Sequence, residues 1–263
     1  MKGRVLIIAG SDSGGGAGIQ ADIKAVTAMG AFAATAITAL TAQNTLGVHG
    51  ILPVPVPFIR QQMEVVLSDI GADALKTGML ADIPVIEAVA EEISRAAAGI
   101  PLVADPVMVA KGGQRLLEER AVEALKRVLL PLAAVITPNL PEAEVLSGRE
   151  IRSPEEMEAA AEAMLTLGVP AVLMKGGHLP GDVVVDLLVT PEGTTRFEAP
   201  RLKTRHTHGT GCTLASAIAA GLAQGMALPD AVARARDYVR AAMATAPGLG
   251  AGHGPLNHAA RWG

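Results

Sequence analysis

Short apolar runs alternate with longer amphipathic segments over most of the 263 residues. The apolar runs are continuous and do not alternate with polar residues, which is typical of strands covered on both faces of a sheet. The predicted strands are 5–9, 33–39, 74–77, 102–104, 134–137 and 171–174, and the predicted helices lie near 17–29, 57–68, 83–97, 118–129, 154–167, 211–224 and 229–244. This order predicts a mostly parallel sheet with right-handed crossovers.

Residues 182–200 interrupt this alternation. Val183–Thr190 and Thr194–Pro200 flank the turn Pro191-Glu192-Gly193, which is the pattern of a β-hairpin. We therefore expect an antiparallel hairpin at one edge of the sheet. No low-complexity linker and no internal repeat divides the chain, so we expect residues 1–263 to form a single α/β domain.

The composition narrows the class of partner. Half of the residues are hydrophobic and only five are aromatic, which predicts a large aliphatic core. Few aromatic residues and a net charge of −4 without a basic run argue against nucleic-acid or membrane partners. A lone Cys212 excludes an intramolecular disulfide. No apolar run approaches the roughly 18–20 residues of a membrane span, and the first residues do not resemble a signal peptide. We therefore expect a cytoplasmic protein.

A glycine-rich turn, Gly209-Thr210-Gly211, places Cys212 at the start of a predicted helix of small residues. Such a turn directs backbone N–H groups to one point, where the helix dipole favours an anion such as phosphate. The same donors would lower the pKa of the Cys212 thiol, so that it could accept a proton. The alternative is a tight turn followed by a small buried cysteine. The histidines lack zinc-ligand spacing, and we expect His208 to order the turn.

A second glycine-rich stretch, residues 9–22, follows the first predicted strand and opens the first helix. Its glycine spacing matches neither the dinucleotide-binding fingerprint nor the P-loop. Because so many glycines are costly in backbone entropy, we expect a ligand to approach the backbone here. Asp22, one turn into the helix, could then accept hydrogen bonds from it. The alternative is a structural loop with Asp22 in solvent.

Two side chains at strand ends could bind a flat ring. Gln43 follows a predicted apolar strand, at the edge where ligand sites of α/β sheets gather. Its amide offers a donor and an acceptor to the edge of a heterocycle. A turn with local hydrogen bonds explains residues 42–48 equally well. Met79, after the next strand, could pack on the ring, although a methionine there is more often part of the core.

Charged and amide side chains follow three later strands. Asp105, Asn139 and Glu142 are hard oxygen ligands of the kind that hold Mg²⁺ directly or through its waters, although single residues of this kind are usually turns or caps. Lys175 leaves a buried strand beside two glycines, from where it could reach a phosphate. The alternative for Lys175 is a surface lysine whose stem packs on the sheet.

Taken together in chain order, the motifs cover almost the whole sequence, at residues 8–22, 38–45, 76–80, 137–143, 174–178 and 208–213. In these motifs the chain resembles the ribokinase-like superfamily, and closely the hydroxymethylpyrimidine/phosphomethylpyrimidine kinases of thiamine biosynthesis. The resemblance implies a three-layer α/β/α fold and a homodimer. It also implies ATP- and Mg²⁺-dependent phosphorylation of 4-amino-5-hydroxymethyl-2-methylpyrimidine to its monophosphate and then to its diphosphate.

The resemblance also assigns a role to each motif. For the substrate, it implies that Gln43 and Asp22 bind the pyrimidine and that Gly10, Met79 and Val107 line its pocket. For the phosphates, it implies that Lys175 contacts the transferring groups and that Gly209, Thr210 and Gly211 form the anion hole. It also implies that Asp105, Asn139 and Glu142 organise Mg²⁺ and its waters. Many members of the superfamily have an aspartate base where this chain has Cys212. A weakly basic thiol suits a second acceptor that is already anionic, because an aspartate would repel it. The glycine loops 111–113 and 176–181 are candidates for closing over the substrate.

Three other functions compete with this one. A pyridoxal kinase of the same superfamily is the nearest, although pyridoxal-active relatives often use a second cysteine and Cys212 is alone here. A non-catalytic sensor of a thiamine precursor would not require Lys175, Asp105 and the glycine turn. An NAD-dependent oxidoreductase fails on the glycine spacing, and no acidic residue ends the second predicted strand.

Overall fold

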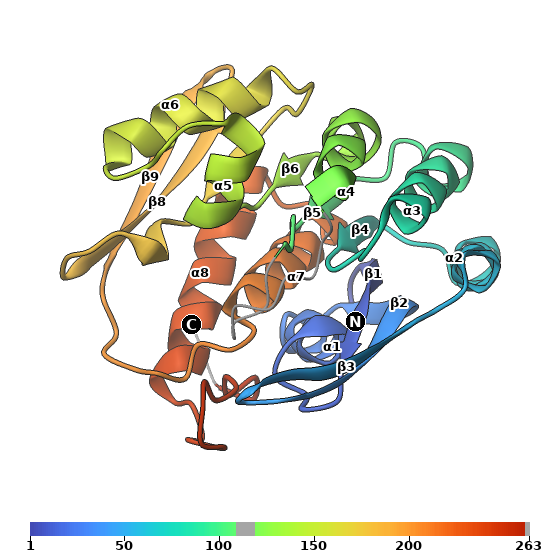
Figure 1. Ribbon diagram of the computed structural model, residues 1–263, viewed down its shortest axis with the longest axis horizontal. Coiled ribbons are helices and arrows are strands. Elements are labelled where there is room, and N and C mark those ends of the chain that lie inside the picture. The colour runs from blue at the N-terminus through green and yellow to red at the C-terminus, as the bar shows by residue number, and fades with distance from the viewer. Residues whose placement is uncertain (109–118, 261–263) are drawn as a thin grey trace.

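The computed structural model describes residues 1–108 and 119–260, whose strands form one sheet in the order β3-β2-β1-β4-β5-β6-β7-β8-β9 (Figure 1). The strands are β1 (Arg4–Asp12), β2 (Phe32–Asn44), β3 (Gly47–Pro53), β4 (Ala74–Thr77), β5 (Leu102–Ala104), β6 (Val135–Ile136), β7 (Val172–Met174), β8 (Val183–Thr190) and β9 (Gly193–Pro200). The helices are α1 (Gly18–Ala28), α2 (Val56–Asp69), α3 (Ile83–Ala96), α4 (Glu119–Ala124), α5 (Leu140–Ser147), α6 (Pro154–Leu165), α7 (Thr210–Ala223) and α8 (Leu228–Ala244).

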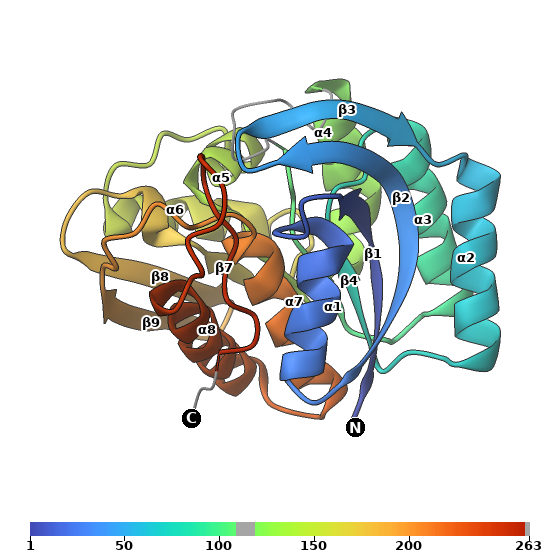
Figure 2. The same cartoon turned by 90° about the horizontal axis from the view of Figure 1, so that it is seen from below.

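The middle of the sheet, from β2 to β7, is parallel, and both edges are antiparallel. Helices cover both faces, which explains the continuous apolar strands. In β1, for example, Val5 and Ile7 face one core, with α1, α7 and α8, while Leu6 and Ile8 face the other, with α2 and α3 (Figure 2). The predicted mostly parallel sheet and the hairpin of β8 and β9 are confirmed.

Three elements differ from the sequence-based expectation. The strand predicted at 33–39 continues to Asn44 and pairs with an unpredicted antiparallel strand, β3, whose two glycines and terminal proline hide its pattern. The unpredicted helix α5 begins with a capping box of Asn139 and Glu142, with Pro141 in its first turn, a signal that the sequence does contain. The described part of the helix predicted at 118–129 is α4 followed by a π-helical turn, Leu125–Leu129.

The strand order creates a crevice at the carboxyl ends of the parallel strands. β2 and β3 lie on one side of β1, and the chain then places β4 on the other side. In an open α/β sheet, the crossovers on the two sides of such a switch point diverge and leave room for a ligand. Residues that end β1, β2 and β4 are therefore brought to the same opening. After α8, the chain returns to the turn between β2 and β3, where the His253 N–H donates to the Thr45 carbonyl (Figure 2).

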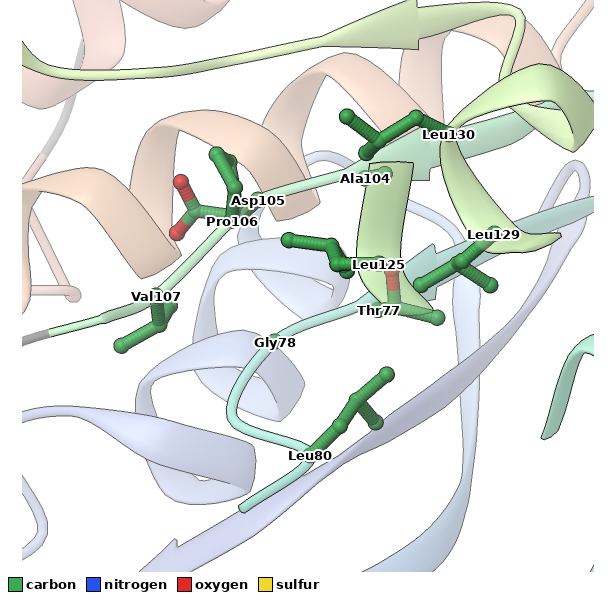
Figure 3. A pocket seen from close by; sticks show the side chains of 10 residues that line it. All are labelled: Thr77, Gly78, Leu80, Ala104, Asp105, Pro106, Val107, Leu125, Leu129 and Leu130. Atoms are coloured by element: carbon green, nitrogen blue, oxygen red, sulfur yellow. The ribbon is translucent and has the colours of Figure 1, made fainter. Parts of the chain in front are cut away.

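Thr77 gives a stability prediction. Its buried hydroxyl has no hydrogen-bond partner among the residues that the structure describes, and it borders a cavity of about 10 Å³ near Leu125 and Leu129 (Figure 3). Thr77→Val keeps the shape and removes the unpaired hydroxyl. We expect the free energy of unfolding to rise by about 1 kcal/mol, seen as a rise in Tm of about 2 °C in thermal denaturation.

Thr38→Val is the matched control. Thr38 is equally buried, but its hydroxyl donates to the Met79 carbonyl over 2.7 Å. Its replacement should lower the free energy of unfolding by about 1–2 kcal/mol, because that carbonyl loses its partner. If Thr77→Val instead lowered the Tm, a water in the small cavity would be satisfying the hydroxyl, since a space of this size can hold one.

Candidate active site

A cleft of about 1070 Å³ opens at the carboxyl ends of the parallel strands and at the N-terminus of α7. The predicted site residues that line it are Gly10, Gln43, Met79, Asp105, Val107, Asn139, Glu142, Lys175, Gly209, Thr210, Gly211 and Cys212. They come from strand ends, loops and helix starts along most of the chain, and they meet because parallel strands end at one edge of a sheet. Asp22 does not line the cleft.

The N-terminus of α7 forms the end of the cleft that suits an anion. Gly209 caps the helix with a left-handed backbone, φ 83°, and a Cβ there would overlap the carbonyl oxygen of Gly16. The backbone N–H groups of Gly211 and Cys212 donate to no backbone oxygen of the described residues. These free donors, with the positive end of the helix dipole, match the binding of a phosphate.

Lys175 stands opposite this helix end. It follows β7, and its Nζ lies 2.9 Å from Asp105 Oδ1, to which the Thr137 hydroxyl also donates over 3.0 Å. Burial by itself would lower the Lys175 pKa, but the charges of Asp105 and Glu142 outweigh it and raise the pKa. Lys175 is therefore a fixed cation. A Cβ on Gly211 would lie only 3.1 Å from Nζ, so the lysine closely approaches the backbone of α7.

The predicted magnesium ligands divide into two groups. Asn139 Oδ1 accepts a hydrogen bond from the backbone N–H of Glu142, and Glu142 Oε2 accepts one from the backbone N–H of Asn139. These two side-chain oxygens therefore cap α5. The Asn139 oxygen thus has a structural role in the cap, and a role of Asn139 at Mg²⁺ stays a prediction. Burial raises the pKa of Glu142 to about 7. Among residues 1–108 and 119–260, no three His, Cys, Asp or Glu side chains form a metal cluster.

Asp22 has a different place from the one expected. It is fully buried, with Oδ2 2.8 Å from Lys76 Nζ and Oδ1 2.7 Å from the Ser216 hydroxyl. Both oxygens bind protein groups, so direct contact with a pyrimidine is not supported. Lys76, whose role the sequence motif left open, is also fully buried. Burial lowers its pKa, but Asp22, Cys212 and Asp105 together raise it more, so the lysine stays charged.

The thiol of Cys212 also differs from expectation. Burial raises its pKa to about 12, and the positive charge of Lys76 offsets this effect only in part. The prediction that the helix start lowers this pKa is therefore wrong. In this structure Cys212 is a neutral thiol, because the helix donors do not compensate for its removal from water.

Asp12 is a site residue whose role the sequence did not indicate. It ends β1, lines the cleft and accepts the N–H groups of Gly14, Gly16 and Ala17. His208 Nε2 lies 2.8 Å from Asp12 Oδ2. His208 thus joins the first glycine-rich loop to the turn before α7, which extends its expected role of ordering that turn. This role could have been predicted from an aspartate within a glycine-rich loop, because its carboxylate can bind several free backbone N–H groups.

Of the two loops considered as lids, Gly176–Gly181 is held by Arg201. The guanidinium donates to the carbonyl oxygens of Gly177, Leu179 and Gly181. Because one rigid group binds three carbonyls, we interpret this segment as a fixed wall of the cleft. Residues 111–113 lie outside the described part of the chain.

The fold and the site together define a ribokinase-like kinase. The pyridoxal kinase of Bacillus subtilis, solved as an ADP complex, superposes with a TM-score of 0.92 and 38% identity over 99% of this chain and 98% of that one. The phosphomethylpyrimidine kinase of Clostridium difficile superposes with a TM-score of 0.81 and 41% identity over 91% of this chain and 98% of that one. The chain belongs to the phosphomethylpyrimidine kinase family, whose model matches residues 12–257.

Curated relatives agree with this family. The hydroxymethylpyrimidine/phosphomethylpyrimidine kinase of Bacillus subtilis is 47% identical over 97% of this chain and 94% of its own length. The thiamine biosynthesis bifunctional protein ThiED of Geobacter sulfurreducens is 51% identical over 98% of this chain. The chain spans only 52% of the length of ThiED.

Proposed function

We propose that the protein transfers the γ-phosphoryl group of ATP to the hydroxyl of 4-amino-5-hydroxymethyl-2-methylpyrimidine, and then phosphorylates the resulting ester. The observation that carries this proposal is the meeting of Lys175, Asp105 and the free N–H groups of α7 in one cleft with Gln43 and Met79. Phosphoryl transfer depends mainly on positioning and charge stabilisation, which these groups provide.

In this proposal the ring stacks near Met79, Gly10 and Val107, and Gln43 reads its edge. A side chain on Gly10 would contact the Met79 methyl group, so glycine keeps the ring pocket open. Lys175 and the N–H groups of Gly211 and Cys212 stabilise the charge that builds up on the transferring phosphoryl group.

Mg²⁺ would be held by Asp105 and Glu142, mostly through water, together with the phosphates of ATP. Carboxylates near Lys175 fit this cation, and Mg²⁺ typically keeps several waters when only one or two carboxylates bind it. Asp105 Oδ2 faces Gly211, at the phosphate end of the cleft. The ion would neutralise phosphate charge.

The state of Cys212 agrees with acceptance of two different substrates. A neutral thiol can sit beside the anionic monophosphate without repelling it, whereas an aspartate could not. A thiol of this pKa is protonated near neutral pH and cannot accept the proton of the acceptor hydroxyl, so we expect Cys212→Ala to slow both phosphorylations only modestly. Equal and complete loss of both steps in single-turnover assays would contradict this role.

A pyridoxal kinase is the second candidate, favoured by the TM-score of 0.92 to the Bacillus subtilis enzyme. The decisive experiment incubates the protein with Mg-ATP and either pyridoxal or the hydroxymethylpyrimidine and identifies the products by mass spectrometry. Pyrimidine monophosphate followed by diphosphate supports the first proposal. Phosphorylation of pyridoxal alone supports the second.

We further propose a cytoplasmic homodimer in which residues 1–263 act as one domain. The joining of the described strands in one sheet supports the single domain.

Exposed apolar side chains near the β3 edge of the sheet support the dimer. They lie on β2, β3 and α2 and are Leu40, Leu52, Phe58 and Val65. No described helix is both long and apolar enough to cross a bilayer. Light scattering should give twice the chain mass, and a monomer at micromolar concentration would contradict the dimer.

The raised pKa of Glu142 predicts a pH-dependent demand for Mg²⁺. The pKa of about 7 lies above the ordinary value of 4.5, so the ionised carboxylate is disfavoured in the folded protein and exists mainly above pH 7. Because Mg²⁺ binds the ionised form, its apparent affinity should fall as the pH falls through 7. We expect the Mg²⁺ concentration for half-maximal rate to be about tenfold higher at pH 6 than at pH 8.

Glu142→Gln is the control for this prediction. Glutamine can still accept the N–H of Asn139 and keep the capping box of α5. The variant should need more Mg²⁺ at every pH and lose most of the pH dependence. A wild-type Mg²⁺ requirement that does not change between pH 6 and pH 8 would contradict the assignment.

A further inference from the structure

A chain of polar contacts crosses the cleft from the first glycine-rich loop to β2. His208 Nε2 lies 2.8 Å from Asp12 Oδ2 and 3.5 Å from Gln43 Nε2. Gln43 Oε1 lies 3.1 Å from the Thr41 hydroxyl oxygen, and that hydroxyl oxygen lies 2.8 Å from the Ser11 carbonyl oxygen. All five residues line the cleft.

Asp12 determines which ring nitrogen of His208 carries a hydrogen. Asp12 Oδ2 already accepts the N–H groups of Gly16 and Ala17. Burial raises the Asp12 pKa, but the hydrogen bonds from His208 and from the backbone outweigh burial and lower it, so the group is an ionised acceptor. His208 must therefore donate to it through a hydrogen on Nε2. The same nitrogen then has no lone pair for Gln43.

Thr41 determines which atom of the Gln43 amide faces it. Its hydroxyl has a single hydrogen, which is used by the Ser11 carbonyl, because a carbonyl oxygen can only accept. Toward Gln43 the Thr41 oxygen is thus an acceptor. As placed in the structure, the amide sets Gln43 Nε2 against the N–H of His208 and Gln43 Oε1 against the Thr41 oxygen. Rotating the amide by half a turn exchanges the two atoms and satisfies both neighbours, because Nε2 then donates to Thr41 and Oε1 faces the N–H of His208.

We propose that His208, held by Asp12, and Thr41 lock the amide of Gln43 in this orientation and so determine which pyrimidine edge the protein accepts. The inference rests on the proposed function, in which Gln43 reads the ring. An amide has two hydrogens and two acceptor sites, so one of each remains for the ligand. The ligand must then present an acceptor near Thr41 and a donor near His208.

A 4-aminopyrimidine has this pattern, with its ring nitrogen N3 beside the 4-amino group. Placing the amino group on the His208 side also places the neighbouring 5-hydroxymethyl group on that side. His208 directly precedes Gly209, so the reacting hydroxyl is directed to the N-terminus of α7. A 4-oxo analogue in its N3–H form presents the reverse pattern, and the locked amide rejects it.

The test compares kcat/KM for 4-amino-5-hydroxymethyl-2-methylpyrimidine with kcat/KM for its 4-oxo analogue. A site that pairs with specific polar groups can discriminate by 10⁴-fold or more, and we expect a ratio of about 10³ or more for the wild type. Thr41→Val and His208→Phe free the amide to rotate, so each should lower the ratio about tenfold or more. Thr41→Ser keeps the hydroxyl and should keep the ratio.

The ratio separates a positioning role from general damage, because a loss of folded protein lowers both rates equally. Thr41→Val tests the lock independently of His208, whose replacement also affects the turn before α7. An unchanged ratio in both variants, with an active wild type, would overturn the amide lock and leave the proposed kinase function intact. A wild type that phosphorylates neither pyrimidine would overturn both.

Discussion

Replacing Lys175 by methionine is expected to lower kcat/KM for the pyrimidine by about 10²–10³-fold, with most of the loss in kcat. Lys175 is a partly buried cation 2.9 Å from Asp105 and close to the backbone of Gly211. Removing one preorganised donor from a site that stabilises developing charge costs a factor of this size. The interaction strengthens as charge moves in the transition state, so its loss appears in kcat more than in KM.

Lys24→Met is the matched control for this prediction. Lys24 donates to the Gly15 carbonyl over 2.8 Å, in the same glycine-rich loop that packs against α7, but it does not line the cleft. Steady-state kinetics of Lys24→Met should stay within about threefold of the wild type, in line with an exposed side chain. Similar rates for the two variants would contradict the role given to Lys175, provided that thermal denaturation shows both to be folded.

Replacing Lys76 by methionine is expected to lower the free energy of unfolding by about 3–5 kcal/mol at pH 7–8. The substitution leaves Asp22 as a fully buried carboxylate whose remaining side-chain partner is the Ser216 hydroxyl. An uncompensated buried charge is strongly destabilising, whereas replacing a whole buried pair by neutral groups is often tolerated. Urea denaturation followed by circular dichroism measures the change.

The double variant Lys76→Met/Asp22→Asn tests the cause. It removes both charges and leaves an amide that can still bond Ser216, so most of the lost stability should return. The non-additivity of the single and double variants measures the coupling within the pair. If the double variant were as unstable as Lys76→Met alone, the loss would come from packing around the methionine and not from the unpaired charge.

Much of the fold follows from patterns in the sequence. Continuous apolar runs separated by helical segments predicted the parallel sheet, because a strand buried on both faces has no polar side. The β8–β9 hairpin was readable from Pro191-Glu192-Gly193 between two β-rich runs. β3 was not readable, because its residues Gly47–Pro53 pair only with β2 and have no continuous apolar pattern of their own.

The general location of the site was also predictable. Polar residues that follow buried strands must meet at one edge of a parallel sheet, and for this reason Gln43, Asp105 and Lys175 line the same cleft. The glycine turn before α7 could be recognised as an anion site because local backbone geometry determines where its N–H groups point.

The partner of each polar side chain was decided only by the tertiary structure. The Asp22 carboxylate bonds Ser216, 194 residues away, and Asp12 bonds His208, 196 residues away. No local pattern encodes contacts of such separation, so the sequence could not tell an aspartate facing a ligand from one buried in an ion pair. Nor could it give the pKa of Cys212, because burial depends on every element packed around the thiol. The sequence by itself determined the sheet and its ligand-binding edge, and the tertiary structure decided which groups there remain free to act.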